Sequence, residues 1–145
     1  MNVPVKQLSG TAKLPVYATE GAAAADICAD LLGPVFIEPG ETALVGTGLA
    51  AAVPEGFVML VYPRSGLAVK EGLTLANCVG VIDSDYRGEI KVALHNISNE
   101  QRVIEPGQRI AQVTITPAGR AVFVSADELS DTGRGDGGFG STGRG

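Results

Sequence analysis

Charged side chains are scarce in this 145-residue chain. They make up 19% of it, against about 25% in a typical globular protein, while apolar types reach 45%. That leaves little charge to cover the surface of a monomer, so the sequence favours a symmetric oligomer that hides apolar faces between subunits. A monomer with an unusually apolar surface is the alternative.

Charge of one sign does not gather anywhere in the chain. The net charge is −5, from 11 Lys and Arg and 16 Asp and Glu, and neither sign forms a long block. The basic footprint of a protein that binds nucleic acid or an anionic membrane is therefore missing, and neither partner is expected. A polyphosphate ligand would depend on a few arginines, on backbone amides and on a divalent cation.

Cysteine, histidine and long apolar runs are lacking as well. Cys28 and Cys78 form no Cys-x-x-Cys pair, which predicts two free and buried thiols in a reducing compartment. His95 is the single histidine, expected at the surface or an interface, so the ligand set of a zinc deaminase is missing. Without a signal peptide, a membrane-spanning run or a P-loop motif, we expect a cytoplasmic protein that binds phosphate in another way.

Short apolar stretches separated by turn sequences dominate residues 1–125, as in a β-sandwich or barrel. The apolar run Phe57–Tyr62 predicts a strand buried on both sides. Alternation over Glu89–Leu94 predicts a half-buried strand, and Ile110–Ile115 marks another. One short helix is expected over about Ser65–Glu71.

Residues 126–145 differ in character from this β domain. Gly133–Gly145 contains seven glycines and one large apolar residue, Phe139, and so cannot build a core. One interpretation is a disordered end. The other is an arm that orders over a ligand, with amides close to phosphates and Phe139 against a flat ring.

Two segments carry candidate chemistry. Pro63-Arg64-Ser65-Gly66 opens the expected helix and outlines an anion site, although a helix cap with a solvated arginine is equally compatible. Asn77–Val92 reads as a strand, turn, strand hairpin. Asp83 follows apolar residues there, and at the edge of a partly dry site its carboxylate could hold and deprotonate water. A plain hairpin with acids facing water is the alternative.

The Asn77–Val92 segment resembles the uracil-binding and catalytic hairpin of trimeric dUTPases, with the pattern Gly-x-Ile/Val-Asp-x-x-Tyr-Arg-Gly-Glu-Ile-x-Val. Four further segments are similar to that family and occur in the same order. They are Ala23-Ala24-Ala25-Asp26-Ile27, Pro63-Arg64-Ser65-Gly66, Gly107-Gln108-Arg109-Ile110-Ala111-Gln112 and Arg134–Gly143. In the first, Ala24 and Ala25 stand where the family commonly has a glycine and an aromatic residue.

The resemblance implies an all-β, jelly-roll-like homotrimer that hydrolyses dUTP to dUMP and pyrophosphate. Asp83 would activate a water that attacks the α-phosphorus, and Asp26 would hold, through water, a Mg²⁺ ion chelated mainly by the substrate phosphates. The positions that match phosphate contacts are Arg64, Ser65, Gly66 and Gln112. Those that match the uracil reader are Asn77, Gly80, Val81 and Ile82.

The remaining matched positions concern the sugar and the arm. Tyr86 would lie against the deoxyribose and exclude a 2′-hydroxyl, and Lys91 matches a further substrate contact. The arm of a neighbouring subunit would close over phosphates and base through Arg134, Phe139, Gly140, Ser141 and Thr142.

Two other functions fit parts of the same pattern. A dCTP deaminase shares the fold and the triphosphate site but acts on the base, and the Asp83 and Tyr86 segment argues against it. A non-catalytic trimeric jelly-roll, used for binding or assembly, is the second alternative, which the intact carboxylate, serine and arm disfavour.

Overall fold

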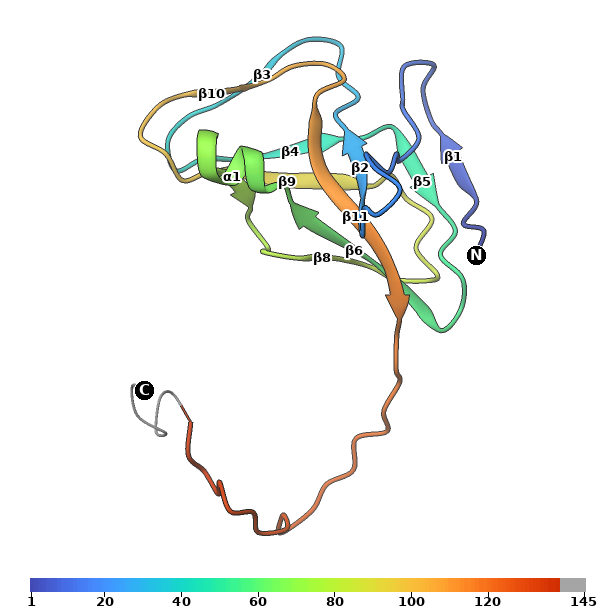
Figure 1. The fold of residues 1–145 in the computed structure, drawn as a ribbon, viewed down its shortest axis with the longest axis vertical. Coiled ribbons are helices and arrows are strands. Elements are labelled where there is room, and N and C mark those ends of the chain that lie inside the picture. Colours follow the sequence, from blue (N-terminus) through green and yellow to red (C-terminus); the bar gives the residue numbers. More distant parts are fainter. Residues whose placement is uncertain (139–145) are drawn as a thin grey trace.

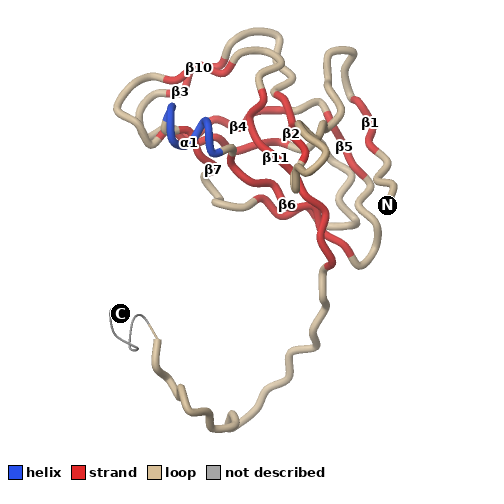
Figure 2. The backbone as a smooth tube through the Cα atoms, viewed as in Figure 1, coloured by secondary structure: helices blue, strands red, loops and turns tan. Residues whose placement is uncertain are grey.

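The computed structural model describes residues 1–138. It contains eleven strands and one helix: β1 Val5–Gln7, β2 Ala25–Cys28, β3 Val35–Ile37, β4 Thr42–Gly46, β5 Leu49–Ala51, β6 Phe57–Pro63, α1 Ser65–Glu71, β7 Leu73–Leu75, β8 Gly80–Ile82, β9 Lys91–Asn96, β10 Arg102–Ile104 and β11 Arg109–Pro117. The expected all-β fold with one short helix is confirmed, and Figure 2 shows the helix as a small addition to the strands.

Two antiparallel sheets form the two main layers (Figure 1). One has the order β2-β11-β6-β8 and the other the order β4-β9-β7, while β1-β5 and β10-β3 are two-stranded pairs. The predicted alternation in β9 is confirmed, since Val92 and Leu94 are 1% exposed, whereas Lys91 is exposed and Ala93 is half-buried. These inward side chains pack with those of the other sheet, such as Ile27 and Val113, in one core.

Strand β6 corrects one expectation. Met59 and Val61 are buried at 3% exposure, but Val58, Leu60 and Tyr62 on the other face are only half-buried. The expected burial on both sides is therefore wrong for the single chain, because nothing in the described residues fully covers the outer face of this sheet. That face remains available to a partner.

The segment 77–92 differs from a second expectation of the sequence analysis. Its order of strand, turn and strand is confirmed, but β8 pairs with β6, whereas β9 pairs with β4 and β7. The expected hairpin is thus a crossover, residues 83–90, from one sheet to the other. Stacked sheets lie about 10 Å apart, a distance that the eight residues of the crossover span easily. Both β8 and β9 can therefore contribute to the shared core.

Helix α1 has the predicted bounds. Leu67 is its buried residue, and Gly72 ends it in the left-handed conformation, at φ 64°, with its N–H donating to the Leu67 carbonyl. This conformation is costly for residues with a Cβ, which explains the glycine.

The two cysteines are free thiols, as expected, but their burial differs from the prediction. Cys28 is half-buried and Cys78 is exposed, in a turn where its φ is 61°. His95 lies near the end of β9, and its Nδ1 is 2.9 Å from Thr42 Oγ1, which confirms a satisfied residue near the surface.

An N-terminal loop is tied to the segment after β2 through Asp30. Ser9 and Thr11 donate hydroxyl hydrogen bonds to its two carboxylate oxygens, at 2.5 and 2.6 Å. Both bonds lower the pKa of the Asp30 carboxyl, and the bond from Ser9 has the larger effect.

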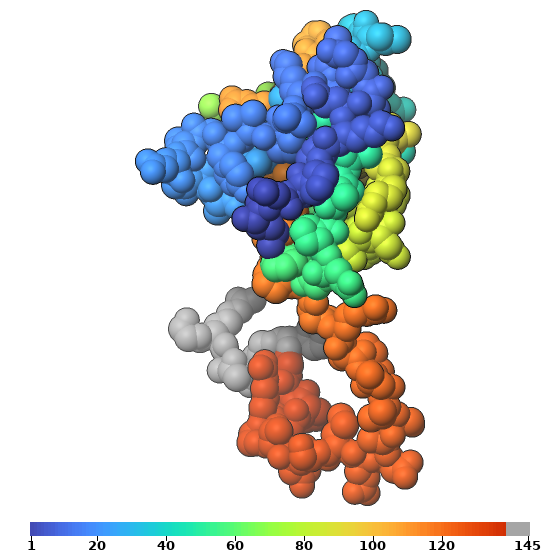
Figure 3. All heavy atoms as spheres, turned by 90° about the vertical axis from the view of Figure 1, so that its right-hand side faces the viewer, coloured from blue at the N-terminus to red at the C-terminus, as the bar shows by residue number. Residues whose placement is uncertain are grey.

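The chain leaves the β domain after β11. Residues 118–138 contain neither helix nor strand, and Val122 and Phe123 are 89% and 96% exposed. Figure 3 shows this segment, in orange and red, extending away from the body. The domain boundary between residues 125 and 126 stays a prediction, and Phe139, Gly140, Ser141 and Thr142 lie outside the described residues. Across the described part of the chain, no helix has the length and apolar character to cross a bilayer.

Candidate functional site

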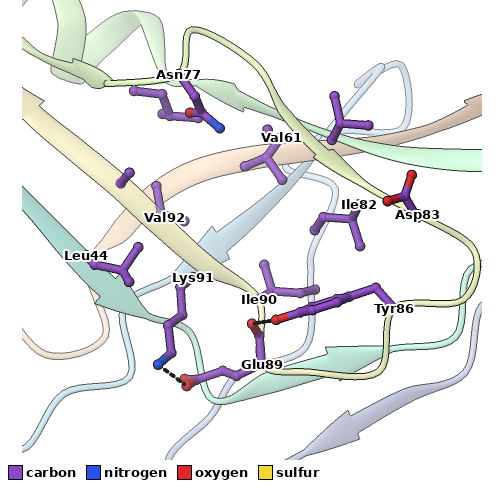
Figure 4. A pocket seen from close by; sticks show the side chains of 14 residues that line it. Leu44, Val61, Asn77, Ile82, Asp83, Tyr86, Glu89, Ile90, Lys91 and Val92 are labelled. Carbon is purple, nitrogen blue, oxygen red and sulfur yellow. Dashed lines mark hydrogen bonds and ion pairs between the residues drawn. The ribbon is translucent and has the colours of Figure 1, made fainter.

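A first cavity of about 360 Å³ lies beneath the crossover, and we call it the crossover pocket (Figure 4). Every site residue predicted from the segment 77–92 lines it: Asn77, Gly80, Val81, Ile82, Asp83, Tyr86 and Lys91. Its floor comes from core side chains of both sheets, including Val61 and Val92. The structure therefore brings together the residues that the resemblance assigns to base, sugar and catalysis.

Strand β8 is the edge strand of its sheet. One side of Gly80–Ile82 pairs with β6, so the other side presents backbone N–H and C=O groups to the pocket mouth. Gly80 packs tightly against the neighbouring strand β6, since an added Cβ would lie 3.0 Å from Val61 Cβ. A rigid row of donors and acceptors at a strand edge can pair with the polar edge of a nucleobase.

Asn77 enters the pocket from a tight turn after β7. The N–H of Cys78 donates to the Leu75 carbonyl at 3.1 Å, and that of Val79 to the Asn77 carbonyl at 2.6 Å. The left-handed Cys78 makes this reversal possible. The turn sets the Asn77 amide beside the β8 edge.

Asp83 begins the crossover at the rim of the pocket (Figure 4). A turn follows it, in which the Tyr86 N–H donates to the Asp83 carbonyl at 3.2 Å. Arg87 braces this turn by donating to the Ser84 and Tyr86 carbonyls at 2.7 and 2.8 Å. Asp83 itself is exposed, so the expected partly dry setting is wrong for the single chain, in which none of residues 1–138 covers the rim.

A second cavity of about 560 Å³, the arginine pocket, contains the residues predicted to bind the phosphates and the metal. Asp26 from β2, Arg64 before α1 and Gln112 from β11 line it with Ser65 and Gly66 at the helix start. Register explains the grouping, because Gln112 pairs with Asp26 on one side and with Tyr62 on the other. Residues that are far apart in sequence thus share one face of the sheet.

Arginine and aspartate dominate the electrostatics of this pocket. Arg64 Nε is 2.8 Å from Asp26 Oδ1, and Arg109 Nη1 is 3.0 Å from Asp26 Oδ2. Arg64 is therefore an oriented side chain, and the alternative of a solvated arginine is wrong. Sequence reasoning missed Arg109 as a site residue, although it lies inside the Gly107–Gln112 segment that was singled out.

The arginine pocket also has room for a ligand close to its backbone. Ser65 and Gly66 are exposed, and a Cβ added to Gly66 would meet nothing within 4 Å. Gln112 is held in place because its Nε2 donates to the Pro63 carbonyl at 3.0 Å. Two guanidinium groups, a hydroxyl and an amide make this a good setting for a polyphosphate.

The side chains of the arginine pocket suit a magnesium ion only when phosphate oxygens supply most of its ligands. No three His, Cys, Asp or Glu residues cluster in residues 1–138, and Asp26 is the carboxylate of the arginine pocket. Mg²⁺ commonly binds through one or two carboxylates, retained waters and substrate phosphates. Asp26 is a carboxylate of the kind that such an ion uses.

The two pockets lie on opposite faces of the same sheet. They share no lining residue, and consecutive residues of β6 divide between them, Val61 in the crossover pocket and Tyr62 in the arginine pocket. Successive strand residues point to opposite faces. The sheet therefore separates the predicted base and catalytic residues of one chain from its predicted phosphate residues.

The family model of dUTPase matches residues 11–143. The deoxyuridine 5'-triphosphate nucleotidohydrolase of Hydrogenobaculum sp. is 52% identical over 144 residues, which cover 99% of each chain. That of Chlamydia pneumoniae is 50% identical over 94% of this chain and 95% of its own.

Solved structures agree with these relatives. A mutant dUTPase of Staphylococcus bacteriophage 80alpha, in complex with dUpNHpp, superposes with a TM-score of 0.89 at 29% identity, covering 99% of each chain. A mutant dUTPase of S. aureus phage phi11, described for the coordination of a structural Mg(II) ion, has a TM-score of 0.80 at 25% identity, covering 89% of this chain and 99% of its own. The matched sequence, the matched fold and the residues grouped in the two pockets show that this chain belongs to the dUTPase family.

Proposed function

We propose that the chain hydrolyses dUTP at composite sites, each built from the crossover pocket of one subunit and the arginine pocket of another. Hydrolysis of dUTP to dUMP and pyrophosphate follows from membership of the dUTPase family. The observation that carries the composite site is the position of the two pockets on opposite faces of one sheet. A single nucleotide has to reach both sets of residues, which requires a second chain.

Uracil recognition is assigned to the edge of β8 and to Asn77. Fixed backbone donors and acceptors leave cytosine with mismatched groups, and each buried orphan costs about 1–3 kcal/mol. A rigid edge with no space for a 5-methyl group would reject thymine by a clash. Tyr86 would lie against the deoxyribose and Lys91 would contact the substrate from the next strand.

The chemical step is assigned to Asp83. Its carboxylate takes a proton from a water whose oxygen forms a bond to the α-phosphorus, while the bond to the bridging oxygen of the β-phosphate breaks and pyrophosphate leaves. Arg64, Ser65, Gly66 and Gln112 would bind the phosphates, with Ser65 near the leaving oxygen. The substrate would be the Mg²⁺ complex of dUTP, which Asp26 would hold through water, and the metal would offset phosphate charge.

A homotrimer accounts for features that the single chain leaves open. The outer face of β6 exposes part of Leu60 and Tyr62, and little charge is available to solvate such faces. A neighbouring subunit would cover them and bring its own pocket to the exposed Asp83.

The arm is assigned to closure over a neighbour's site. Arg134 lies in a turn in which its Nε donates to the Gly137 carbonyl at 2.9 Å, and residues 119–136 are exposed. In its own chain the described arm lines neither pocket. Arg134 would therefore act on another subunit, and the family resemblance assigns Phe139, Gly140, Ser141 and Thr142 to the same closure.

The two free thiols support the prediction of a cytoplasmic enzyme.

A substrate panel tests the reaction itself. With Mg²⁺, we expect pyrophosphate release from dUTP to exceed that from dTTP, dCTP and UTP by at least about 10²-fold, since each mismatched buried group adds its own penalty. Chelation of the metal should remove most of this activity. Ammonia released from dCTP without pyrophosphate would indicate a deaminase, and no turnover of any nucleotide would indicate a non-catalytic assembly.

Mixed oligomers test the composite site. Asp83→Asn damages the crossover pocket and Arg64→Ala the arginine pocket, so each variant alone should be nearly inactive. After co-refolding in equal amounts, random trimers would restore about one quarter of the wild-type sites, because each mixed ring has one interface with both intact halves. Activity that stays at the level of the separate variants, in confirmed mixed trimers, would place both halves in one chain.

A further inference from the structure

Glu89 has no assigned role, yet its carboxylate contacts both the Gly48 backbone and the Lys91 side chain beside the crossover pocket. Its side chain is 29% exposed and lines the pocket beside Tyr86 and Lys91 (Figure 4). Its Oε1 accepts the N–H of Gly48 at 3.0 Å, and its Oε2 lies 3.6 Å from Lys91 Nζ. The carboxylate thus joins the pocket wall to the turn between β4 and β5.

The turn between β4 and β5 is held in place by hydrogen bonds of its own. Thr47 is fully buried, and its hydroxyl donates to the Ile90 carbonyl at 2.6 Å. The Leu8 N–H donates to the Gly48 carbonyl at 2.7 Å from the other side. A Cβ on Gly46 would lie 2.6 Å from Glu89 Oε1, so glycine at this position leaves space for the carboxylate.

The backbone of Glu89 holds the tyrosine. Tyr86 Oη donates to the Glu89 carbonyl at 2.9 Å, which turns the ring back across the pocket (Figure 4). Gly88 permits this approach, since an added Cβ would lie 2.4 Å from Tyr86 Oη. The ring position therefore depends on where the carbonyl of Glu89 is held.

We propose that Glu89 is a positioning residue for sugar selection. The Glu89 carboxylate anchors its own backbone to the turn between β4 and β5, and so it fixes the position of the Tyr86 ring against the deoxyribose. The same carboxylate orients the Lys91 ammonium. This rests on the proposed function, in which Tyr86 meets the sugar. Loss of the anchor lets the ring retreat, so that a ribose with its 2′-hydroxyl enters more easily.

The test is the ratio of kcat/KM for dUTP to kcat/KM for UTP. Glu89→Ala removes the anchor but keeps the carbonyl that Tyr86 uses, and the ratio should fall about tenfold, the scale of one lost hydrogen bond to a charged group. Glu89→Gln keeps an acceptor for the Gly48 N–H, and its loss should stay within about twofold because exposed ion pairs contribute little. Gly88→Ala displaces the ring directly and should reproduce the tenfold fall.

The controls separate positioning from general damage. Glu55→Ala, at an exposed glutamate in the turn before β6, should leave the ratio unchanged. If Glu89 had a merely structural role, kcat/KM would fall by the same factor for dUTP and for UTP, and their ratio would keep its wild-type value. That result in either Glu89→Ala or Gly88→Ala overturns the inference. Tyr86→Ala reports on the proposed function separately: if it retains full selectivity, Tyr86 does not read the sugar.

Discussion

Asp83→Asn should lower the turnover of dUTP by about 10²-fold or more, while the variant still binds the nucleotide. The amide has nearly the same size as the carboxylate but cannot accept a proton from the attacking water, and this loss is typical for a general base. Turnover is measured by pyrophosphate release, and binding by titration calorimetry with a non-hydrolysable dUTP analogue.

Asp85 offers a matched control in the same turn. It is also exposed and lies two residues from Asp83, but it does not line the crossover pocket. Asp85→Asn should keep turnover within about twofold of wild type, as surface substitutions usually do. If Asp83→Asn turns over dUTP as fast as Asp85→Asn, Asp83 is not the base.

Removal of Asp131–Gly145 should reduce kcat/KM for dUTP by about 10²-fold or more, without loss of folding or of the oligomer. The deleted segment carries every predicted arm contact with phosphates and base, and such pre-positioned donors each contribute strongly in a closed site. The β domain ends its last strand at Pro117, and residues 131–136 are exposed, so the core keeps its contacts.

Light scattering and thermal unfolding would check the state of the truncated protein. Arg134→Gln isolates the charge of the arm and should cause a smaller loss than the truncation. Full activity of the truncated chain, as an intact oligomer, would mean that the segment is only a disordered end.

Much of the architecture could be predicted from local patterns. The helix Ser65–Glu71 has its predicted bounds, and the alternation around β9 correctly identified its buried face. The residues expected in the base and phosphate sites do gather in two pockets. These successes rest on properties that a short stretch of chain carries by itself, such as side-chain periodicity and helix termini.

Long-range pairing could not be predicted in the same way. Asn77–Val92 has the local appearance of a hairpin, yet β8 joins β6 and β9 joins β4. Strand partners depend on how apolar faces from the whole chain share a core, which no single segment contains. For the same reason the role of Arg109 in the site could not be predicted, because its partner Asp26 lies 83 positions away in the sequence.

The sequence by itself determined the β-rich class, the short helix and the identity of the chemical groups, because residue type and spacing set local conformation and reactivity. Only the tertiary structure decided that Asp83 and Arg64 lie on opposite faces of one sheet, that Asp26 is shared by two arginines, and that Glu89 and Gly88 hold Tyr86. These relations arise from strand register and layer packing, which place distant residues together and separate neighbours such as Val61 and Tyr62.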